Sequence, residues 1–217
     1  MSGRITRPTS FCRSGVKRVR IGIVSDIHAN IRGLNLALEA IGDIDELLCL
    51  GDSIFEYQFS NDVVGLLKDR GAYVIQGNHE EVFLSEAGRR ARERPGIDPD
   101  LLQWLADQPH RREVEFGGTR ILMVHSTPWE PRGTYVYPHS AHLERFAEVD
   151  ADFVMYGHTH AQVVKRIGNV TIVNPGSAGD ARDNNNNRQL SCAVLETETG
   201  EIVVTDYPDP RYAPRPL

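Results

Sequence analysis

The residues in this sequence with the clearest capacity for chemistry are imidazole, carboxylate and amide side chains, each of which follows an apolar run. They are Asp26, His28, Asp52, Asn78, His79, His125, His158 and His160. Five of the eight histidines fall in this set. Nitrogen and oxygen ligands without thiolates suit borderline divalent ions such as Mn, Fe, Ni or Zn, and do not indicate structural zinc. The set therefore predicts a metal centre.

Each member taken alone also has an ordinary structural explanation. Asp26 could be a turn residue, His125 a buried hydrogen-bonded histidine and Asn78 a helix cap. The joint pattern favours the metal centre. Glycine also stands immediately before three of the proposed ligands or ligand pairs, where a backbone must turn sharply, at positions 51, 77 and 157.

The elements that would position these side chains are short β-strands rich in aliphatic and β-branched residues. They are expected at 19–25, 46–50, 72–76, 119–125 and 152–156. A helix is expected at 31–41, behind Asn30 as its N-cap. Each proposed ligand lies at the C-terminal end of a strand, and in an open α/β sheet those ends converge on one crevice. Residues up to 134 positions apart can therefore become neighbours.

The C-terminal part is expected to be mostly strands, at 161–167, 169–173, 190–197 and 201–207, joined by tight turns. The fold class that follows is α/β, a mixed sandwich without internal repeats. Two segments with several prolines, glycines and arginines, 85–100 and 126–138, are expected to be long loops. Residues 183–188 are expected to form a solvated turn.

The proposed ligands form an ordered series of motifs. In chain order these are Asp26-x-His28, Gly51-Asp52, Gly77-Asn78-His79-Glu80, His125 and Gly157-His158-Thr159-His160. The series resembles the calcineurin-like metallophosphoesterase superfamily, and Asn174-Pro175-Gly176-Ser177 resembles a segment of its small bacterial and archaeal phosphodiesterase-like members. One departure is Glu80, where small members often have Asp. The resemblance implies a four-layer α/β/β/α sandwich of two mixed β-sheets flanked by helices.

The resemblance also implies a role for each residue. One metal would take Asp26, His28 and His160, the other Asn78, His125 and His158, and Asp52 would bridge the two. Two divalent transition-metal ions are expected, with Mn favoured over Fe, Ni or Zn. A hydroxide between the metals would attack phosphorus in line. His79 would act as the general acid or charge stabiliser, with a purely structural role as its alternative.

Substrate selection is the least determined part. The resemblance favours a small phosphodiester, with a phosphomonoester, nucleotide or phosphoprotein as alternatives. A non-catalytic scaffold, for which a retromer subunit is the precedent in the family, is the competing class, and the full set of site residues weighs against it. Arg132 could bind a distal phosphate, and Trp129, Tyr135 and Tyr137 could stack on a base or simply fix their loop.

The composition sets the remaining expectations. The 217 residues suit one domain, predicted at 19–217, after a basic disordered leader at 1–18. The six basic residues of the first 20 leave 18 Lys and Arg against 30 acids, so the rest of the chain is strongly acidic and has no obvious nucleic-acid surface. No membrane span or secretory signal is apparent. Three scattered cysteines fit a reducing cytoplasm. The oligomeric state is left open.

Overall fold

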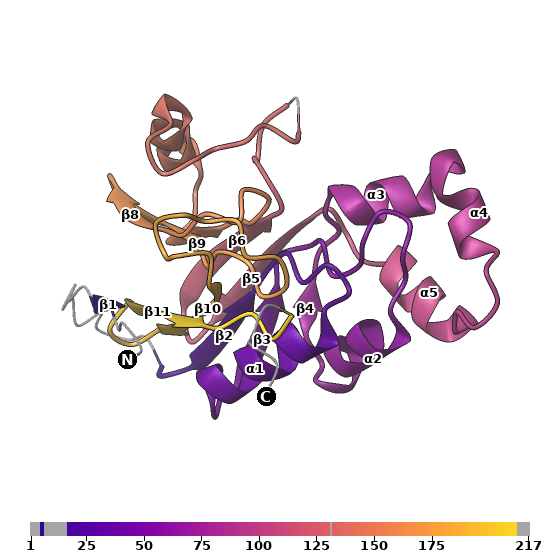
Figure 1. The fold of residues 1–217 in the computed structure, drawn as a ribbon. Helices are drawn as coiled ribbons and strands as arrows, with labels where there is room; N and C mark the ends of the chain where they lie inside the picture. The colour runs from indigo at the N-terminus through magenta and orange to yellow at the C-terminus, as the bar shows by residue number, and fades with distance from the viewer. Residues whose placement is uncertain (1–4, 7–16, 131, 212–217) are drawn as a thin grey trace.

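The computed structural model describes residues 5–6, 17–130 and 132–211. Within these residues the strands form two sheets (Figure 1). The larger sheet has the order β1-β11-β10-β2-β3-β4. Its members are β1 (Ile5–Thr6), β2 (Arg20–Val24), β3 (Glu46–Cys49), β4 (Tyr73–Val74), β10 (Leu190–Glu196) and β11 (Glu201–Tyr207). β2, β3 and β4 are parallel, whereas β10 pairs antiparallel with both β2 and β11.

The smaller sheet has the order β5-β6-β7-β9-β8 and is also mixed. Its members are β5 (Arg111–Phe116), β6 (Thr119–Val124), β7 (Phe153–Met155), β8 (Val163–Ile167) and β9 (Val170–Asn174). β6, β7 and β9 are parallel, and β5 and β8 are antiparallel edges. Each sheet thus contains three adjacent parallel strands that can present side chains at one common end.

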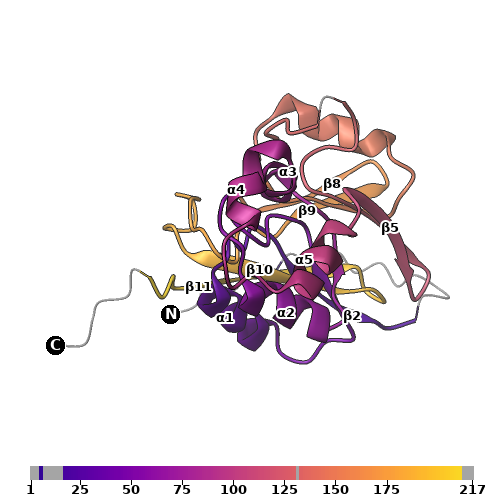
Figure 2. The ribbon, with the colours of Figure 1, turned by 90° about the vertical axis from the view of Figure 1, so that its right-hand side faces the viewer.

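Helices cover the outer faces of the two sheets. α1 (Ile31–Ile41) and α2 (Asn61–Asp69) lie under the larger sheet, and the 3₁₀ segment η2 (Ala141–Glu148) lies over the smaller one (Figure 1). At one end of the sandwich are α3 (Asn78–Leu84), η1 (Glu86–Gly88), α4 (Arg89–Arg92) and α5 (Pro99–Ala106), which face the viewer in Figure 2. The expected sandwich of two mixed sheets with flanking helices is confirmed.

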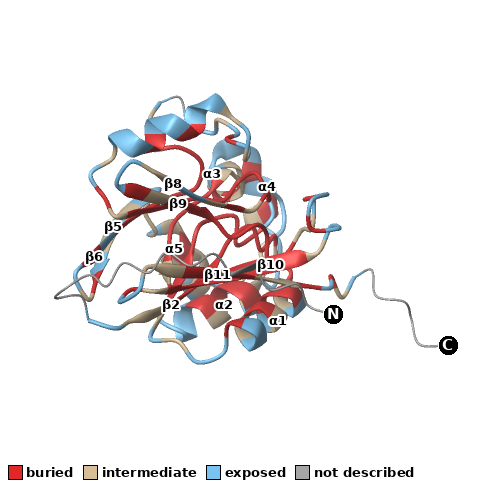
Figure 3. Ribbon diagram, turned by 90° about the vertical axis from the view of Figure 1, so that its left-hand side faces the viewer, coloured by how far each residue is buried: buried red, intermediate tan, exposed pale blue. Residues whose placement is uncertain are grey.

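Alternation along the strands builds the core. In β2, Ile21 and Ile23 pack between the two sheets, and Val24 packs toward α1 and α2. Leu48 of β3 likewise joins the inter-sheet cluster, in which Met123 and Phe153 come from the smaller sheet. Figure 3 shows the resulting band of buried residues through both sheets, with exposed residues mainly on the outer helices, the turns and the edge strands β5 and β8. A rigid, fully packed interior therefore fixes the strand ends.

Most predicted elements are confirmed. α1 has the expected bounds, and the Asn30 side chain accepts from the Gly33 N–H as its N-cap. The strand predictions agree to within about two residues, apart from the two-residue β4. The pattern did not assign α2, α3, α5, β5 or η2.

The prediction of a long loop at 85–100 is wrong, because η1, α4 and the start of α5 occupy this segment. Its breaker residues mark helix starts. Asp98 caps α5, with Pro99 in the first turn, and Arg92 donates to the carbonyls of Phe83 and Ser85. In contrast, the described residues of 126–138 contain no helix or strand, as predicted.

The predicted leader lies outside the described residues except for Ile5–Thr6, which pair with β11, and residues 17–18. The single domain at 19–217 stays a prediction, and its last six residues are also outside the description. Within the described ranges, no helix combines the length and the apolar character needed to cross a bilayer.

Candidate metal centre

The eight predicted site residues come from both sheets and meet at one edge of the sandwich. Three of them follow β2 and β3, two begin α3 just after β4, His125 follows β6 directly, and two follow β7. The crevice is therefore formed by the C-terminal ends of two parallel sets of strands, one in each of the two expected sheets. Side chains gather in three groups, and within each group the possible ligand atoms lie within 4.8 Å of one another. These are Asp26/His28/His160, His28/Asp52/His79 and Asp52/His125/His158.

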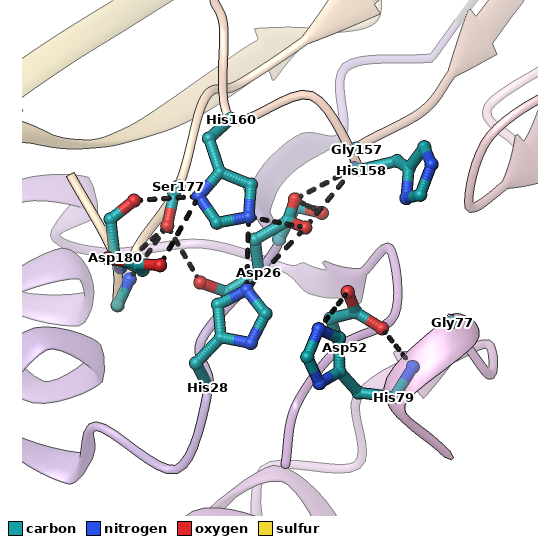
Figure 4. A network of polar contacts seen from close by, with 12 residues as sticks. Asp26, His28, Asp52, Gly77, His79, Gly157, His158, His160, Ser177 and Asp180 are labelled. Atoms are coloured by element: carbon teal, nitrogen blue, oxygen red, sulfur yellow. Dashed lines mark hydrogen bonds and ion pairs between the residues drawn. The ribbon is translucent and has the colours of Figure 1, made fainter. Parts of the chain in front are cut away.

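The first group is centred on the Asp26 carboxylate, which lies beside the rings of His28 and His160 (Figure 4). Nε2 of His160 is 3.3 Å from Asp26 Oδ1, and Nε2 of His28 is 4.0 Å from the same oxygen. The two Nε2 atoms are 3.0 Å apart. All three side chains are almost completely buried.

The Asp52/His125/His158 group, called the second ligand group below, is centred on His125. Its Nε2 atom is 3.2 Å from Asp52 Oδ2 and 3.1 Å from Asn78 Oδ1. The ring of His158 is edge-on to it, with centroids 5.1 Å apart. Asp52 belongs to groups that include His28 on one side and His125 on the other, which is the placement that a bridging carboxylate requires.

Backbone carbonyls orient three of the histidines from outside. Nδ1 of His125 lies 2.7 Å from the carbonyl oxygen of Leu50, and Nδ1 of His160 lies 2.7 Å from that of Asp180. Nε2 of His158 lies 3.1 Å from the carbonyl oxygen of Gly133. A carbonyl can only accept, so each of these nitrogens carries the proton. The opposite nitrogen of each ring can therefore present a lone pair once any second proton has left, which is the arrangement of a metal ligand.

His28 shows why a cation fits this centre. Its Nδ1 is buried without a hydrogen-bond partner, and its Nε2 faces the Nε2 of His160. The His160 atom holds a lone pair, because the proton of that ring is on Nδ1. Two nitrogens 3.0 Å apart can both bind one ion at about 2.0–2.1 Å. The donor set of imidazoles, carboxylates and one amide oxygen therefore fits borderline divalent ions.

The pKa shifts indicate that the crevice favours positive charge. Burial lowers the pKa of His125, but the Asp52 carboxylate outweighs burial and raises it to about 10. Burial raises the pKa of Asp26, yet His160 and its neighbours hold it well below the usual range. The pKa of His28 falls to about 4, mainly because of burial. Buried carboxylates that stay ionised need cations beside them.

The backbone at the ligands is in an uncommon conformation. Of the eight described non-glycine residues with positive φ, five are predicted ligands, with φ between 48° and 67°. They are Asp26, His28, Asp52, His158 and His160. Left-handed backbone is costly for such residues and persists where the surroundings impose it, typically at functional sites. This signal is independent of the motif pattern.

Two of the three predicted glycines serve a different purpose from the one expected. A Cβ at Gly157 would collide with the side chains of Ser25 and Asp26, and one at Gly77 would collide with Asp52. Neither has a positive φ, unlike Gly51. Glycine at positions 77 and 157 is therefore explained by the close approach of the backbone to the carboxylates. A sharp turn is not the reason.

Glu80 is a site residue whose role the sequence did not indicate. Its buried carboxylate accepts from the N–H groups of Gly77, Asp52, Ser53 and Ile54 and from the Ser53 hydroxyl, at 2.7–3.2 Å. Burial and the Asp52 charge raise its pKa, and the donors oppose this. Glu80 thereby ties the start of α3 to the Asp52 loop. The only sequence signal was its position in the Asn78-His79-Glu80 motif.

His79 lies at the edge of the centre with a defined tautomer. Its Nδ1 accepts from the Glu56 N–H at 2.9 Å, so its ring proton is on Nε2. That Nε2 is 3.7 Å from Asp52 Oδ2 and is on the side of the metal-ligand groups. The ring thus presents a donor to the crevice, as a residue that binds or protonates an oxygen would.

A cleft of about 630 Å³ opens beside Asn78 and His125. His110, Arg132 and Glu130 also line it. Glu81 accepts from Arg132 at 3.0 Å and lies 3.2 Å from His110 Nδ1, so the charges in this cleft are largely paired with one another.

Comparisons with known proteins agree with this geometry. Residues 19–200 match the calcineurin-like phosphoesterase superfamily domain. An uncharacterized protein of Methanocaldococcus jannaschii is 27% identical, over 86% of this chain and 87% of its own. A metallophosphoesterase from Sphaerobacter thermophilus has a similar structure, with a TM-score of 0.71, 24% identity, and 89% and 90% of the two chains covered. A novel archaeal phosphodiesterase also has a similar structure, with a TM-score of 0.56 and 20% sequence identity, and the match covers 87% of this chain and 99% of the archaeal one.

Proposed function

Because this chain belongs to the calcineurin-like phosphoesterase superfamily, a family of hydrolases that act on phosphate esters, we propose that it is a dinuclear metal-dependent phosphodiesterase. The observation that carries the proposal is the pair of ligand groups, Asp26/His28/His160 and Asp52/His125/His158, that meet in one crevice. The alternatives are a phosphomonoesterase or a nucleotide or phosphoprotein phosphatase.

The proposed ligand sets follow the two groups. Asp26, His28 and His160 would hold one ion, and Asn78, His125 and His158 the other, with Asp52 shared between them. When bound, two such ions supply a hydroxide nucleophile near neutral pH and neutralise charge on the phosphoryl oxygens. Mn is the favoured metal, ahead of Fe, Ni or Zn. The carbonyls that accept from His125, His158 and His160 hold these rings in the orientation that binding requires.

His79 is the proposed proton donor. Because Nδ1 accepts from the Glu56 N–H, the Nε2–H is free to donate toward an oxygen of the bound ester. In this tautomer the Nε2–H would stabilise charge on the phosphoryl group, whereas protonation of the departing alkoxide would use the imidazolium form, whose second proton on Nδ1 replaces the contact with the Glu56 N–H. The His79 side chain is 14% exposed, so an ester can reach it.

A phosphodiester is preferred because a cleft beside the centre has room for the substituent that does not leave. The cleft beside Asn78 and His125 extends away from the metal groups, whereas His79 is on the His28 side of Asp52. A diester carries one substituent that leaves and one that stays, and both need room. Likeness at 20% identity to a phosphodiesterase supports the fold only, so this preference depends on the geometry.

The test is hydrolysis of a generic aryl phosphodiester and the matching monoester by the purified chain, after chelation and after addition of Mn. We expect Mn-dependent hydrolysis with the diester preferred. Preference for the monoester would replace the diester proposal by its alternative. Failure to hydrolyse either ester with Mn, Fe, Ni or Zn would favour the scaffold class.

A further inference from the structure

The exposed aromatic side chains of the described residues gather at two short segments. Every exposed large hydrophobic residue in that part of the chain belongs to this set, which consists of Phe55, Tyr57, Tyr135 and Tyr137. The first segment follows the Asp52 loop, and the second follows Gly133, whose carbonyl contacts His158. Of these four rings, Phe55 contacts His28 and Tyr135 contacts His158, and an apolar ring left partly in solvent beside such groups indicates a binding surface.

Phe55 is placed against the first ligand group and the proposed acid. Its ring centroid is 4.8 Å from that of His79 and 5.4 Å from that of His28. A tight turn fixes it, because the backbones of Phe55 and Gln58 exchange two hydrogen bonds of 3.0–3.1 Å. The adjacent Glu56 N–H holds His79 itself. The ring is nevertheless 36% exposed, so part of it remains available to a ligand.

Tyr135 is placed against the second ligand group. It stacks on His158 with centroids 4.0 Å apart and an interplanar angle of 29°. Val136 is fully buried, whereas Tyr135 and Tyr137 are both about half exposed. Tyr135 is 54% exposed although its ring covers His158 and lies parallel to that of Tyr137, with centroids 6.1 Å apart, so part of the ring still faces solvent. In Figure 4, His158 lies apart from His28 and His79. Because Tyr135 contacts His158 and Phe55 contacts His28 and His79, the two aromatic rings lie at different parts of the crevice.

Rings that served only to pack against imidazoles would be more deeply buried. A half-exposed flat ring instead offers a stacking face, and stacking on aromatic side chains is tolerant of the identity of the stacked ring. A phosphate ester bound between the two ligand groups would direct its substituents along the edge of the crevice, where Phe55 and Tyr135 lie. The leaving group would lie on the side of the proton donor His79, which is the side of Phe55.

We propose that Phe55 and Tyr135 are substrate-binding residues that select phosphate esters with flat aromatic substituents, with Phe55 contacting the leaving group. The class includes aryl and nucleoside esters. This inference rests on the proposed function, because it assumes that the ester binds at the metal-ligand groups.

The first test measures binding without turnover. Phenylphosphonate and cyclohexylphosphonate carry the same anionic group on a flat and a puckered six-membered ring. Calorimetric titration of the Mn-loaded protein should show about tenfold tighter binding of phenylphosphonate. The double variant Phe55→Leu/Tyr135→Leu should lose this preference, and the control Tyr57→Leu should keep it. Equal affinity for the two ligands in the wild type would overturn the proposal.

The second test assigns the leaving-group side. Two diesters share a methyl group and differ in the leaving group, a phenol or a fluorinated alkanol of matched acidity. Phe55→Leu should lower the ratio of kcat/KM for the phenyl ester to kcat/KM for the fluoroalkyl ester about tenfold, and Tyr135→Leu should leave this ratio unchanged. An equal loss on both diesters would make Phe55 a support for His79 and overturn its assignment. Hydrolysis without aromatic preference overturns this inference alone, whereas a protein that neither binds nor hydrolyses any ester also overturns the proposed function.

Discussion

At the scale of single residues, the centre combines buried ligands with groups that hold or supply protons. His79 is distinguished from the ligands by the direction of its donor, since Nδ1 accepts from the Glu56 N–H and the Nε2–H is left for the crevice, whereas His125, His158 and His160 direct an N–H to a backbone carbonyl. His125 is distinguished by its charge, because Asp52 raises its pKa to about 10. These differences lead to separate tests.

His79→Ala should retain the metals and the fold and lose roughly 10²–10⁴-fold in kcat, the usual value of a positioned acid. The loss should be larger on an alkyl ester than on an aryl ester, because a phenolate leaves without needing a proton. Measurement of kcat on both esters together with metal content separates the roles. The control His142→Ala, in η2, should change neither kcat nor metal content. An equal loss on both esters would indicate electrostatic stabilisation, and loss of metal would make His79 structural.

Metal binding should release protons at pH 7. The pKa of about 10 means that His125 is protonated in the metal-free protein, and a metal requires its Nε2 lone pair. Apparent metal affinity should therefore rise with pH through the neutral range. Calorimetry at pH 7 in two buffers of different ionisation enthalpy measures the release, and the same apparent enthalpy in both buffers would contradict it.

Glu80→Gln should weaken the whole Asp52 loop. An amide cannot accept from all the donors that the carboxylate satisfies, so unfolding should require about 2–3 kcal/mol less free energy and metal should bind 10–100-fold more weakly. Chemical denaturation and metal titration test this. The neighbouring Glu81→Gln is the control, because its ion pairs are at the surface and contribute at most about 1 kcal/mol. Similar effects of the two substitutions would refute the role given to Glu80.

At the scale of elements, the strand ends determine where ligands can be, and the turns after them determine where ligands point. The order of motifs and the apolar runs were sufficient to predict α1, most strands and the gathering of the eight site residues. They could not predict the left-handed backbone at five ligands, because it is imposed by contacts between loops. Glu80 and the Gly133 carbonyl escaped prediction for the same reason, since both act through backbone atoms. The helices at 85–106 were missed because their caps resemble loop residues.

The close approach at Gly157 gives a prediction for the turn after β7. Gly157→Ala would place a methyl group against Ser25 and Asp26, which lie after β2 in the other sheet. We expect a loss of about 1–3 kcal/mol in stability and loss of metal at the Asp26/His28/His160 group. Gly65→Ala, in the middle of α2, is the matched control, because its methyl would make an ordinary contact with Leu101 and favour the helix. Retention of metal by the Gly157 variant would show that the approach is not required.

At the scale of the whole molecule, the centre joins the two sheets. Asp26, His28, Asp52 and Asn78 follow strands of the larger sheet, and His125, His158 and His160 follow strands of the smaller one. Each of the two proposed metal-ligand sets contains members from both sheets. The two-sheet architecture is thus what makes two neighbouring ligand sets possible, with Asp52 between them.

Metal stoichiometry tests the central claim most directly. The chain would be stripped with a chelator, reconstituted with Mn, freed of unbound metal and subjected to elemental analysis, alongside Asp52→Asn. The account predicts close to two ions per chain in the wild type and depletion of both in the variant, because Asp52 contributes to each set. A wild-type chain that retains no metal after reconstitution with Mn, Fe, Ni or Zn would contradict it.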